Sequence, residues 1–283
     1  MNADDTGIAA SAHRNPLPNL LDRTPARTEE TAPERQEPTP AEQGRGLPDP
    51  VGGGFRDWIA LRHPFPAGSL RAVLFDFDHT LSDTVLSFPE MRRKGLEALA
   101  RFAPVAADCS LPLMEQMAGI LASLSPATAA EAEKAALDVV KEVEIAAARR
   151  SALFPFARPV LAALRARGTA AAVITRNCPE AVYAVFPDLD DYCACVLTRE
   201  HVKHVKPHPE HIGTALERLG CAARQALTVG DHVMDIEAGK RAGTRTAAVL
   251  TGDSDLAELA GADPDITAPD AGALLRGLGM WRN

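Results

Sequence analysis

Two aspartates, Asp76 and Asp78, follow directly on a short apolar run. Residues 72–75 read A-V-L-F, which is typical of a buried strand. Because side chains alternate along a strand, residues i and i+2 face the same way, and both carboxylates are expected to enter one cleft. Two like charges held this close repel each other, and each is costly to desolvate. The pattern indicates a cation and substrate site or, as the plain alternative, a turn after a strand.

Three further polar signals come later in the chain, each after a candidate strand. They are a threonine followed by two polar residues in V-I-T-R-N, a lysine in K-P-H-P-E, and two aspartates in G-D-H-V-M-D. The residues concerned are Thr175, Arg176, Asn177, Lys206, Asp231 and Asp235. Lys203 is a nearby alternative to Lys206 as the lysine of this signal, but Lys206 fits the K-P-x-P pattern better.

Short β-like runs alternate with helical stretches from residue 71 onward. Strands are expected at 71–77, 170–175, 193–198, 226–230 and 245–250, and helices at 159–167, 209–219 and 235–242. Apolar strands that alternate with helices predict an α/β fold, a doubly wound parallel sheet covered on both faces.

One interval between strands is too long for a simple crossover. The first and second expected strands are about 95 residues apart, whereas a strand-helix-strand unit needs about 30. Within 85–151, apolar residues repeat at helical spacing, for example Leu113, Met117, Ile120 and Leu124. We therefore expect an inserted all-helical domain at 85–151 and an α/β core at 55–84 plus 152–283.

The first part of the chain has a different composition. Residues 1–54 are rich in proline and acidic residues and poor in aromatic and branched apolar residues, which predicts a disordered tail. The apolar patch at 55–61 is expected to dock on the core as a helical turn, or else to bind a partner.

Composition limits the classes of function. The formal charge of −8 and the pI near 5.5 argue against a nucleic-acid partner. The sequence has neither an apolar run that could span a bilayer nor a signal peptide, so we expect no membrane partner. The five cysteines fit no disulfide framework, which favours reduced thiols in a cytoplasmic protein.

Taken together, the four motifs resemble the haloacid dehalogenase-like superfamily, in its helical-capped branch that includes phosphoglycolate phosphatase. That pattern is D-x-D-x-T, then Ser or Thr after a strand, then Lys, then G-D-x-x-x-D, and it covers about residues 68–251. The resemblance implies a Rossmann-like core in which the first motif strand lies between the second and the fourth. It also implies that residues 85–151 form a cap.

The resemblance further implies a Mg²⁺-dependent phosphatase that acts on a small phosphate monoester. Asp76, Asp231 and the backbone carbonyl of Asp78 would hold Mg²⁺, and Asp235 would support or join that shell. Asp76 would attack phosphorus, and Asp78 would protonate the leaving alkoxide and then activate water.

Other positions of the motifs are expected to bind the phosphoryl group. Thr175 would donate to it and Lys206 would neutralise charge in the transition state. The residues placed with the substrate are Thr80, Thr175, Arg176, Asn177 and Lys206. Arg176 could instead pair with an acidic residue of the cap on closure.

Alternatives stay open at this point. The same motifs would suit a phosphomutase of the superfamily or an inactive ligand-binding relative. His79 stands where the family often has glycine, and its bulkier side chain is expected to narrow the pocket entrance. Arg92, Arg93 and Lys94 could meet an anionic substrate, although a solvated helix face is the simpler interpretation. The histidines at 201, 204, 208 and 211 are expected at the surface or at a helix start.

Overall fold

The computed structural model describes residues 60–61, 69–105 and 111–282. The expected tail at 1–54, most of the apolar patch at 55–61, and Cys109 lie outside these ranges. The last two residues of the patch, Ala60–Leu61, form strand β1, so this part of the patch is extended where a helical turn was expected.

The described residues contain a seven-stranded sheet in the order β1-β9-β8-β7-β2-β5-β6. Its strands are parallel except at the edge, where β1 pairs antiparallel with β9. Their bounds are Ala72–Phe75 (β2), Ala170–Ile174 (β5), Cys195–Leu197 (β6), Ala226–Gly230 (β7), Arg245–Val249 (β8) and Ile266–Ala268 (β9). The first motif strand, β2, lies between the second, β5, and the fourth, β7, as the resemblance implied.

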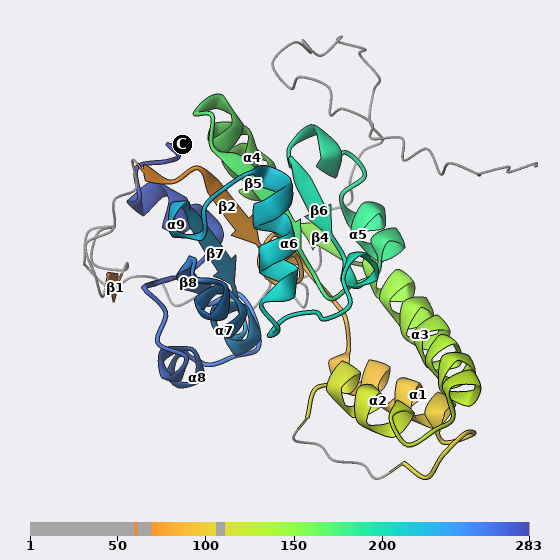
Figure 1. Ribbon diagram of the computed structural model, residues 1–283. Helices are drawn as coiled ribbons and strands as arrows, with labels where there is room; N and C mark the ends of the chain where they lie inside the picture. The colour runs from red at the N-terminus through yellow and green to blue at the C-terminus, as the bar shows by residue number, and fades with distance from the viewer. Residues whose placement is uncertain (1–59, 62–68, 106–110, 283) are drawn as a thin grey trace, which may run out of the picture. The chain divides into compact units, whose positions relative to one another are not determined.

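Helices cover both faces of the sheet, because its central strands are apolar on both sides (Figure 1). In β2, Val73 and Phe75 join the core cluster that includes residues of α4 (Ala157–Ala166) and α9 (Ala271–Gly277). Ala72 and Leu74 point the other way and join the cluster with α6 (Glu210–Leu219) and α7 (Val233–Ala242). The expected doubly wound α/β fold is therefore confirmed.

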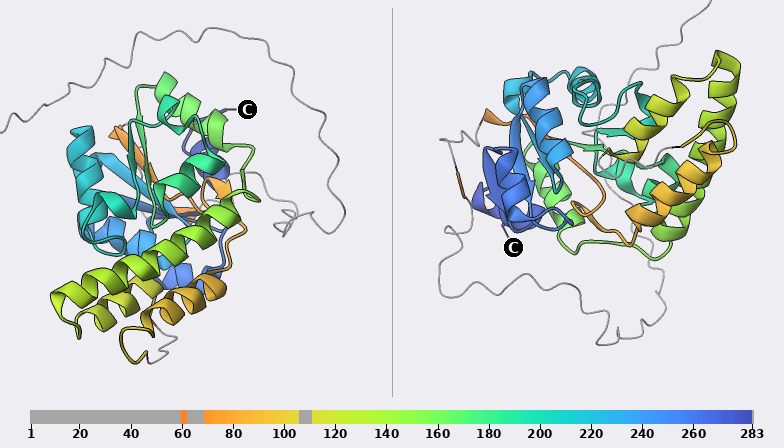
Figure 2. Two further views of the ribbon diagram at one scale, coloured as in Figure 1. Left: turned by 90° about the vertical axis from the view of Figure 1, so that its right-hand side faces the viewer. Right: turned by 90° about the horizontal axis from the view of Figure 1, so that it is seen from below.

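Three helices are inserted between two short strands, β3 (Ser82–Asp83) and β4 (Ala152–Leu153), which pair antiparallel. They are α1 (Phe88–Leu99), α2 (Leu113–Leu121) and α3 (Pro126–Ala148). Serine side chains cap α1 and α3, each with proline in the first turn, which favours helix initiation. These helices pack around a core of their own, in which α3 runs alongside α1 (Figure 2). We call residues 88–148 the helical insertion.

The C-terminal half of α3 also packs against the α/β part, on α5 (Pro179–Val185). Ala148 of α3 belongs to one apolar cluster with Cys178 and Ala181. Nearby, the buried carboxylate of Glu144 accepts from Arg199 Nη1 at 2.5 Å. Removal of either partner of such an ion pair would leave the other charge buried without compensation, so both residues are needed for stability. The insertion and the sheet are thus joined by a packed, charged contact as well as by the two chain connections.

Some element bounds differ from the expectation. Strand β2 ends at Phe75, two residues before the expected end at residue 77, because the chain leaves the strand at Asp76. Helix α7 begins at Val233, since His232 is its N-cap and Asp235 is the third residue of the helix, in a capping box with it. The expected start of this helix at residue 235 is therefore two residues late. Within the described ranges, the structure contains no helix whose length and apolarity would let it cross a membrane.

Candidate active site

One buried ammonium group links two of the motifs. Lys206 Nζ lies 2.6 Å from Asp76 Oδ1 and 2.6 Å from Asp235 Oδ1. The lysine side chain is only 3% exposed, and those of Asp76 and Asp235 are 13% and 3% exposed. Lys203, the competing lysine, is exposed. The choice of Lys206 over Lys203 for contact with the motif aspartates agrees with this geometry.

The electrostatics of this group show an excess of negative charge. Burial raises the pKa of Asp76 to about 7, with Asp235 and Asp78 adding to the rise and Lys206 opposing it. Burial, followed by repulsion from Asp76 and Asp235, raises the pKa of Asp231 well above its ordinary value. Burial alone would lower the pKa of Lys206, but the carboxylates of Asp235 and Asp76 raise it above its ordinary value. The carboxylates therefore outnumber the positive charge that lies among them.

Asp231 stands at the end of β7 and completes the acidic group. Thr80 Oγ1 donates to its Oδ1 at 2.8 Å, and both residues are buried. One carboxylate oxygen from each of Asp76, Asp231 and Asp235 lies within 4.8 Å of the other two. Thr80, expected among the substrate-binding residues, is 0% exposed here, so the contact that it makes orients a carboxylate.

Two glycines leave room for this acidic group. A Cβ on Gly230 would lie 2.3 Å from Asp235 Cγ, and one on Gly252 would lie 1.9 Å from Asp231 Oδ2. Both distances are far below van der Waals contact. Glycine is therefore required at both positions as long as the carboxylates stay where they are.

Asp78 has a separate set of partners. Its Oδ1 accepts from Thr84 Oγ1 at 2.9 Å, and its Oδ2 accepts from Thr175 Oγ1 at 3.3 Å. The side-chain amide of Asn177 donates to both oxygens at 3.2 Å. Neutral donors on both oxygens hold the carboxyl group without a fixed cation. The residues expected to bind a phosphoryl group, Thr175 and Asn177, thus converge on the second motif aspartate.

Arg176 contacts three different segments. Its guanidinium donates to both oxygens of Glu115 on α2, at 3.1 and 2.9 Å. The same Nη1 also lies 2.9 Å from the backbone oxygen of Lys206 and 2.7 Å from the sulfur of Met234. Of the two roles that the sequence left open for Arg176, the structure contains the pairing with an acidic residue of the insertion.

His79 has a backbone conformation that is unusual for its type. Its φ is +57°, in the left-handed region that glycine adopts most easily. This conformation agrees with the glycine that the family resemblance implies at this position of the motif. The imidazole ring lies 6.1 Å from the ring of Phe88, the first residue of α1, so it faces the start of the insertion.

The other charged groups of interest lie outside this site. Lys94 pairs with Glu90 and Arg93 with Glu97, one turn along α1, which favours the solvated helix face over a substrate contact. The histidines at 201, 204 and 208 are exposed, whereas His211, in the first turn of α6, is fully buried. Burial lowers the pKa of His211 to about 3, so it is neutral. The four described cysteines are free thiols, and burial raises the pKa of Cys178 to about 12.

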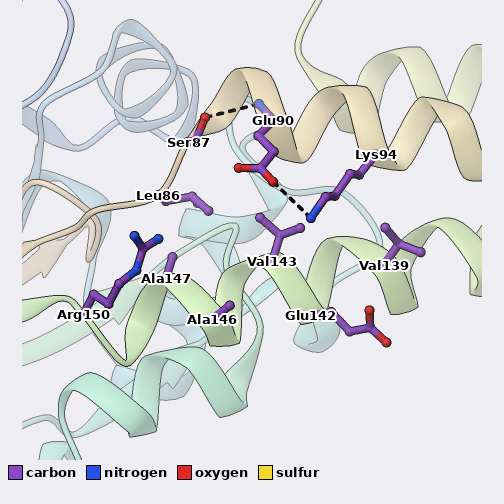
Figure 3. Close-up of a pocket in the computed structure, with 10 residues that line it drawn as sticks. All are labelled: Leu86, Ser87, Glu90, Lys94, Val139, Glu142, Val143, Ala146, Ala147 and Arg150. Carbon is purple, nitrogen blue, oxygen red and sulfur yellow. Dashed lines mark hydrogen bonds and ion pairs between the residues drawn. The ribbon is translucent and has the colours of Figure 1, made fainter.

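A hollow of about 340 Å³ lies between α1 and α3 (Figure 3). Aliphatic side chains such as Val143 form its floor, and Glu90, Lys94 and Arg150 stand around it. No residue of the four motifs lines it, and Glu90 and Lys94 already neutralise each other at 3.0 Å. We therefore place the chemistry at the convergent carboxylates and not in this hollow.

The motif residues expected from the sequence thus lie together at the carboxyl ends of neighbouring strands, where open α/β sheets bind ligands. Sequence reasoning missed Thr84, Glu115 and Gly252. Gly252 follows β8 at the same edge of the sheet, so its position could have indicated it. The sequence indicated an acidic residue of the insertion as a possible partner of Arg176, but nothing identified it as Glu115, 61 residues away.

Comparisons with known proteins agree with the motifs. A family model described as haloacid dehalogenase-like hydrolase matches residues 73–249. Pyrophosphatase PpaX of Anoxybacillus flavithermus is 42% identical over 92 residues, which is 32% of this chain and 43% of that protein. PpaX of Bacillus cereus is 51% identical over 61 residues, 22% of this chain and 28% of that protein. The chain therefore spans less than half the length of these relatives.

Solved structures match over a longer range. CbbY from Rhodobacter sphaeroides, in complex with phosphate, has a TM-score of 0.55 and 23% identity, covering 74% of this chain and 99% of that one. A hydrolase from Pseudomonas syringae has a TM-score of 0.55 and 20% identity, with 74% and 98% coverage. At such identities the likeness shows the fold. The family model spans more than half of the chain, and with the motifs brought together at one sheet edge, the chain belongs to the haloacid dehalogenase-like hydrolases.

Proposed function

We propose that this protein is a Mg²⁺-dependent phosphatase that hydrolyses a small phosphate monoester through a phospho-aspartate. The observation that carries the proposal is the buried contact of Lys206 with Asp76 and Asp235, beside Asp231. An arrangement that kept carboxylates together only as a turn would leave them in solvent, where their mutual repulsion is screened.

The residues present fit a divalent cation. Asp76, Asp231 and Asp235 offer oxygen ligands, which Mg²⁺ prefers. Burial and repulsion between the carboxylates raise the pKa of Asp76 and Asp231, so Lys206 compensates their ionised forms only in part. Asp76, Asp231 and the backbone carbonyl of Asp78 would hold the ion, and Asp235 would support it. When bound, Mg²⁺ would screen the repulsion between the carboxylates and the phosphate and polarise the phosphoryl oxygens.

The two motif aspartates would divide the chemistry. Asp76, at the end of β2, would attack phosphorus through its carboxylate oxygen and form the acyl phosphate. Asp78 has a carboxyl group that accepts hydrogen bonds from Thr84, Thr175 and Asn177, and it would donate a proton to the leaving alkoxide. It would then take a proton from the water that hydrolyses the intermediate.

The phosphoryl group would be bound by donors at the neighbouring strand ends. Thr175 and Asn177 would turn from Asp78 to the phosphoryl oxygens, and the Lys206 ammonium would neutralise charge as the transition state forms. Thr80 would act through Asp231, since its hydroxyl already donates to that carboxylate.

We further propose that residues 85–151 act as a cap on a core made of 55–84 and 152–283. The ion pair of Glu115 with Arg176 lies beside the motif loops, which supports a role for the insertion in excluding water. The four free thiols suit a reducing compartment, and we propose the cytoplasm.

A panel of phosphate esters, with inorganic pyrophosphate included because of the PpaX relatives, tests the proposal in the presence of Mg²⁺ and of chelator. We expect phosphate release that requires Mg²⁺ and is abolished in Asp76→Asn, whereas Asp83→Asn, at an exposed position seven residues later, keeps it. Full activity of Asp76→Asn contradicts the nucleophile assignment. Ester conversion with little free phosphate indicates a phosphomutase, and tight binding without turnover indicates an inactive relative.

A further inference from the structure

The guanidinium of Arg176 is surrounded by protein acceptors. Its Nη2 donates to Glu115, and its Nη1 is within hydrogen-bond reach of Glu115, the Lys206 carbonyl and the Met234 sulfur. The Arg176 side chain is 18% exposed and that of Glu115 is 33% exposed. A guanidinium has five N–H donors in a fixed fork, and bidentate pairing with a carboxylate fixes its orientation. Little of this group is left to meet a substrate.

The contacts of Arg176 join the helical insertion, the start of α7 and the segment around Lys206. Glu115 is in the first turn of α2, in the helical insertion, and Met234 is in the first turn of α7, next to Asp235. The Lys206 carbonyl belongs to the residue whose ammonium contacts Asp76 and Asp235. Arg176 therefore connects the insertion to the main chain of the lysine that neutralises the site.

A second arginine, Arg199, binds the backbone of Arg176. The Arg199 guanidinium donates to the Arg176 carbonyl at 3.1 Å and to Glu144 of α3 at 2.5 Å. Two arginines thus tie the loop after β5 to two different helices of the insertion, α2 and α3. The side chains of Arg199 and Glu144 are 7% and 3% exposed, so this second tie is shielded from solvent and fixed.

We propose that Arg176 is a positioning residue. Through Glu115 it holds the Lys206 loop (residues 203–208) against the helical insertion, and it does not bind the substrate. The inference rests on the proposed phosphatase function for its kinetic readout. With Glu115 in contact, Arg176 fixes the Lys206 carbonyl and hence the approach of its ammonium to the carboxylates. When the insertion moves away, the same guanidinium loses its charge partner and the loop loses one of its restraints.

The test compares kcat and KM of Arg176→Gln for two substrates. In p-nitrophenyl phosphate the organic part of the ester has no ionised group, whereas in phosphoglycolate it carries a carboxylate. A positioning role predicts that kcat falls about tenfold or more for both substrates while KM changes less than about threefold. Glu115→Gln should lower kcat in the same direction by a smaller factor. The double variant should be no slower than Arg176→Gln alone, because both changes break one contact.

Conservative and control variants separate positioning from loss of structure. Arg176→Lys keeps one charged donor and should recover part of the kcat lost in Arg176→Gln. Arg158→Gln breaks another two-point arginine–carboxylate pair, with Asp188, and should leave kcat unchanged. A rise of KM of about tenfold for phosphoglycolate alone, or kcat within about twofold of wild type for both substrates, overturns the proposal.

Hydrogen exchange supplies a readout that does not depend on turnover. Arg176→Gln should raise amide exchange both in residues 203–208 and in α2, because both lose the same tether. Unchanged exchange in both segments overturns the inference, even if the enzyme hydrolyses no ester on the panel. A wild type without phosphatase activity in which Arg176→Gln does loosen both segments would instead contradict the proposed function and leave the tether supported.

Discussion

Replacement of Lys206 by methionine tests the charge balance of the site most directly. Methionine keeps much of the aliphatic stem and removes the ammonium that lies 2.6 Å from both Asp76 and Asp235. Removal of one partner from a buried ion pair costs about 3–5 kcal/mol, since a buried charge is left without compensation. A whole domain is stable by about 5–15 kcal/mol, so the effect is a large share of the total.

We expect the free energy of unfolding of Lys206→Met, measured by urea titration with circular dichroism in chelator, to be lower by about 3 kcal/mol at pH 8. The loss should be smaller at pH 5, because Asp76, whose pKa is about 7 in the wild type, then carries a proton. With Mg²⁺ and substrate, kcat should fall by about 10²–10³, the usual effect of removing one group that stabilises transition-state charge.

Two variants make the experiment decisive. Lys203→Met removes an exposed ammonium three residues earlier, and it should change neither stability nor kcat appreciably. The double variant Lys206→Met with Asp235→Asn also removes one of the two carboxylates that have lost their ammonium partner. It should recover about 1 kcal/mol or more of the free energy of unfolding. A loss below about 1 kcal/mol in chelator at pH 8 would refute the view that Lys206 compensates the carboxylates.

Three other outcomes follow from the geometry. In chelator, the stability of wild type relative to Asp76→Asn should fall by up to about 1.4 kcal/mol per pH unit from about pH 4 to 7, because the folded state keeps a proton that the unfolded chain releases; a flat difference contradicts this. Gly252→Ala, whose Cβ would lie 1.9 Å from Asp231 Oδ2, should weaken Mg²⁺ binding by about tenfold in calorimetry. His79→Gly should be neutral within about 1 kcal/mol by thermal melting, whereas His79→Val should cost more than about 2 kcal/mol at φ +57°.

Two of these experiments depend on a suitable reference. His211 has a pKa of about 3 in the folded state, so the unfolded chain binds the extra proton and stability falls as pH drops below the unfolded value. This trend is opposite to that of Asp76, and the difference between wild type and Asp76→Asn cancels it. For Gly252→Ala the control is Gly213→Ala, where an added Cβ has no heavy atom within 4 Å, and a similar loss of Mg²⁺ affinity in both would argue against the clash.

The sequence was sufficient for the features that depend on local pattern. The apolar runs of β2, β5, β7 and β8 fix strands, and polar residues directly after them must lie at the carboxyl edge once the sheet is parallel. Asp76, Thr175 and Asp231 could therefore be placed at one edge. Lys206 lies nine residues after β6, and only the family resemblance put its side chain with Asp76, 130 residues away. The order of the strands came from the family resemblance and not from the residues.

The features that the sequence left unpredicted depend on long-range pairing or on single contacts. Strands β1 and β9 have only two and three residues and gain their stability from each other and from β8, so no local pattern marks them. The start of α7 was misplaced because histidine is an uncommon N-cap, and its ring accepts from Met234 N here. Glu115 lies on an amphipathic helix like any exposed acid, and only the packed insertion brings it to Arg176.

The charge balance also limits what the site can accept. Among the described residues, the site contains four carboxyl groups, those of Asp76, Asp78, Asp231 and Asp235. Lys206 contributes one ammonium, which contacts Asp76 and Asp235. Arg176, the other cation of the motif loops, is already neutralised by Glu115. A phosphate dianion brought into this region would meet a net negative charge unless protons or a divalent cation entered with it. The raised pKa values of Asp76 and Asp231 have the same cause in the free protein, a shortage of positive charge around buried carboxylates. Metal affinity, stability and pH dependence should therefore change together in the variants above.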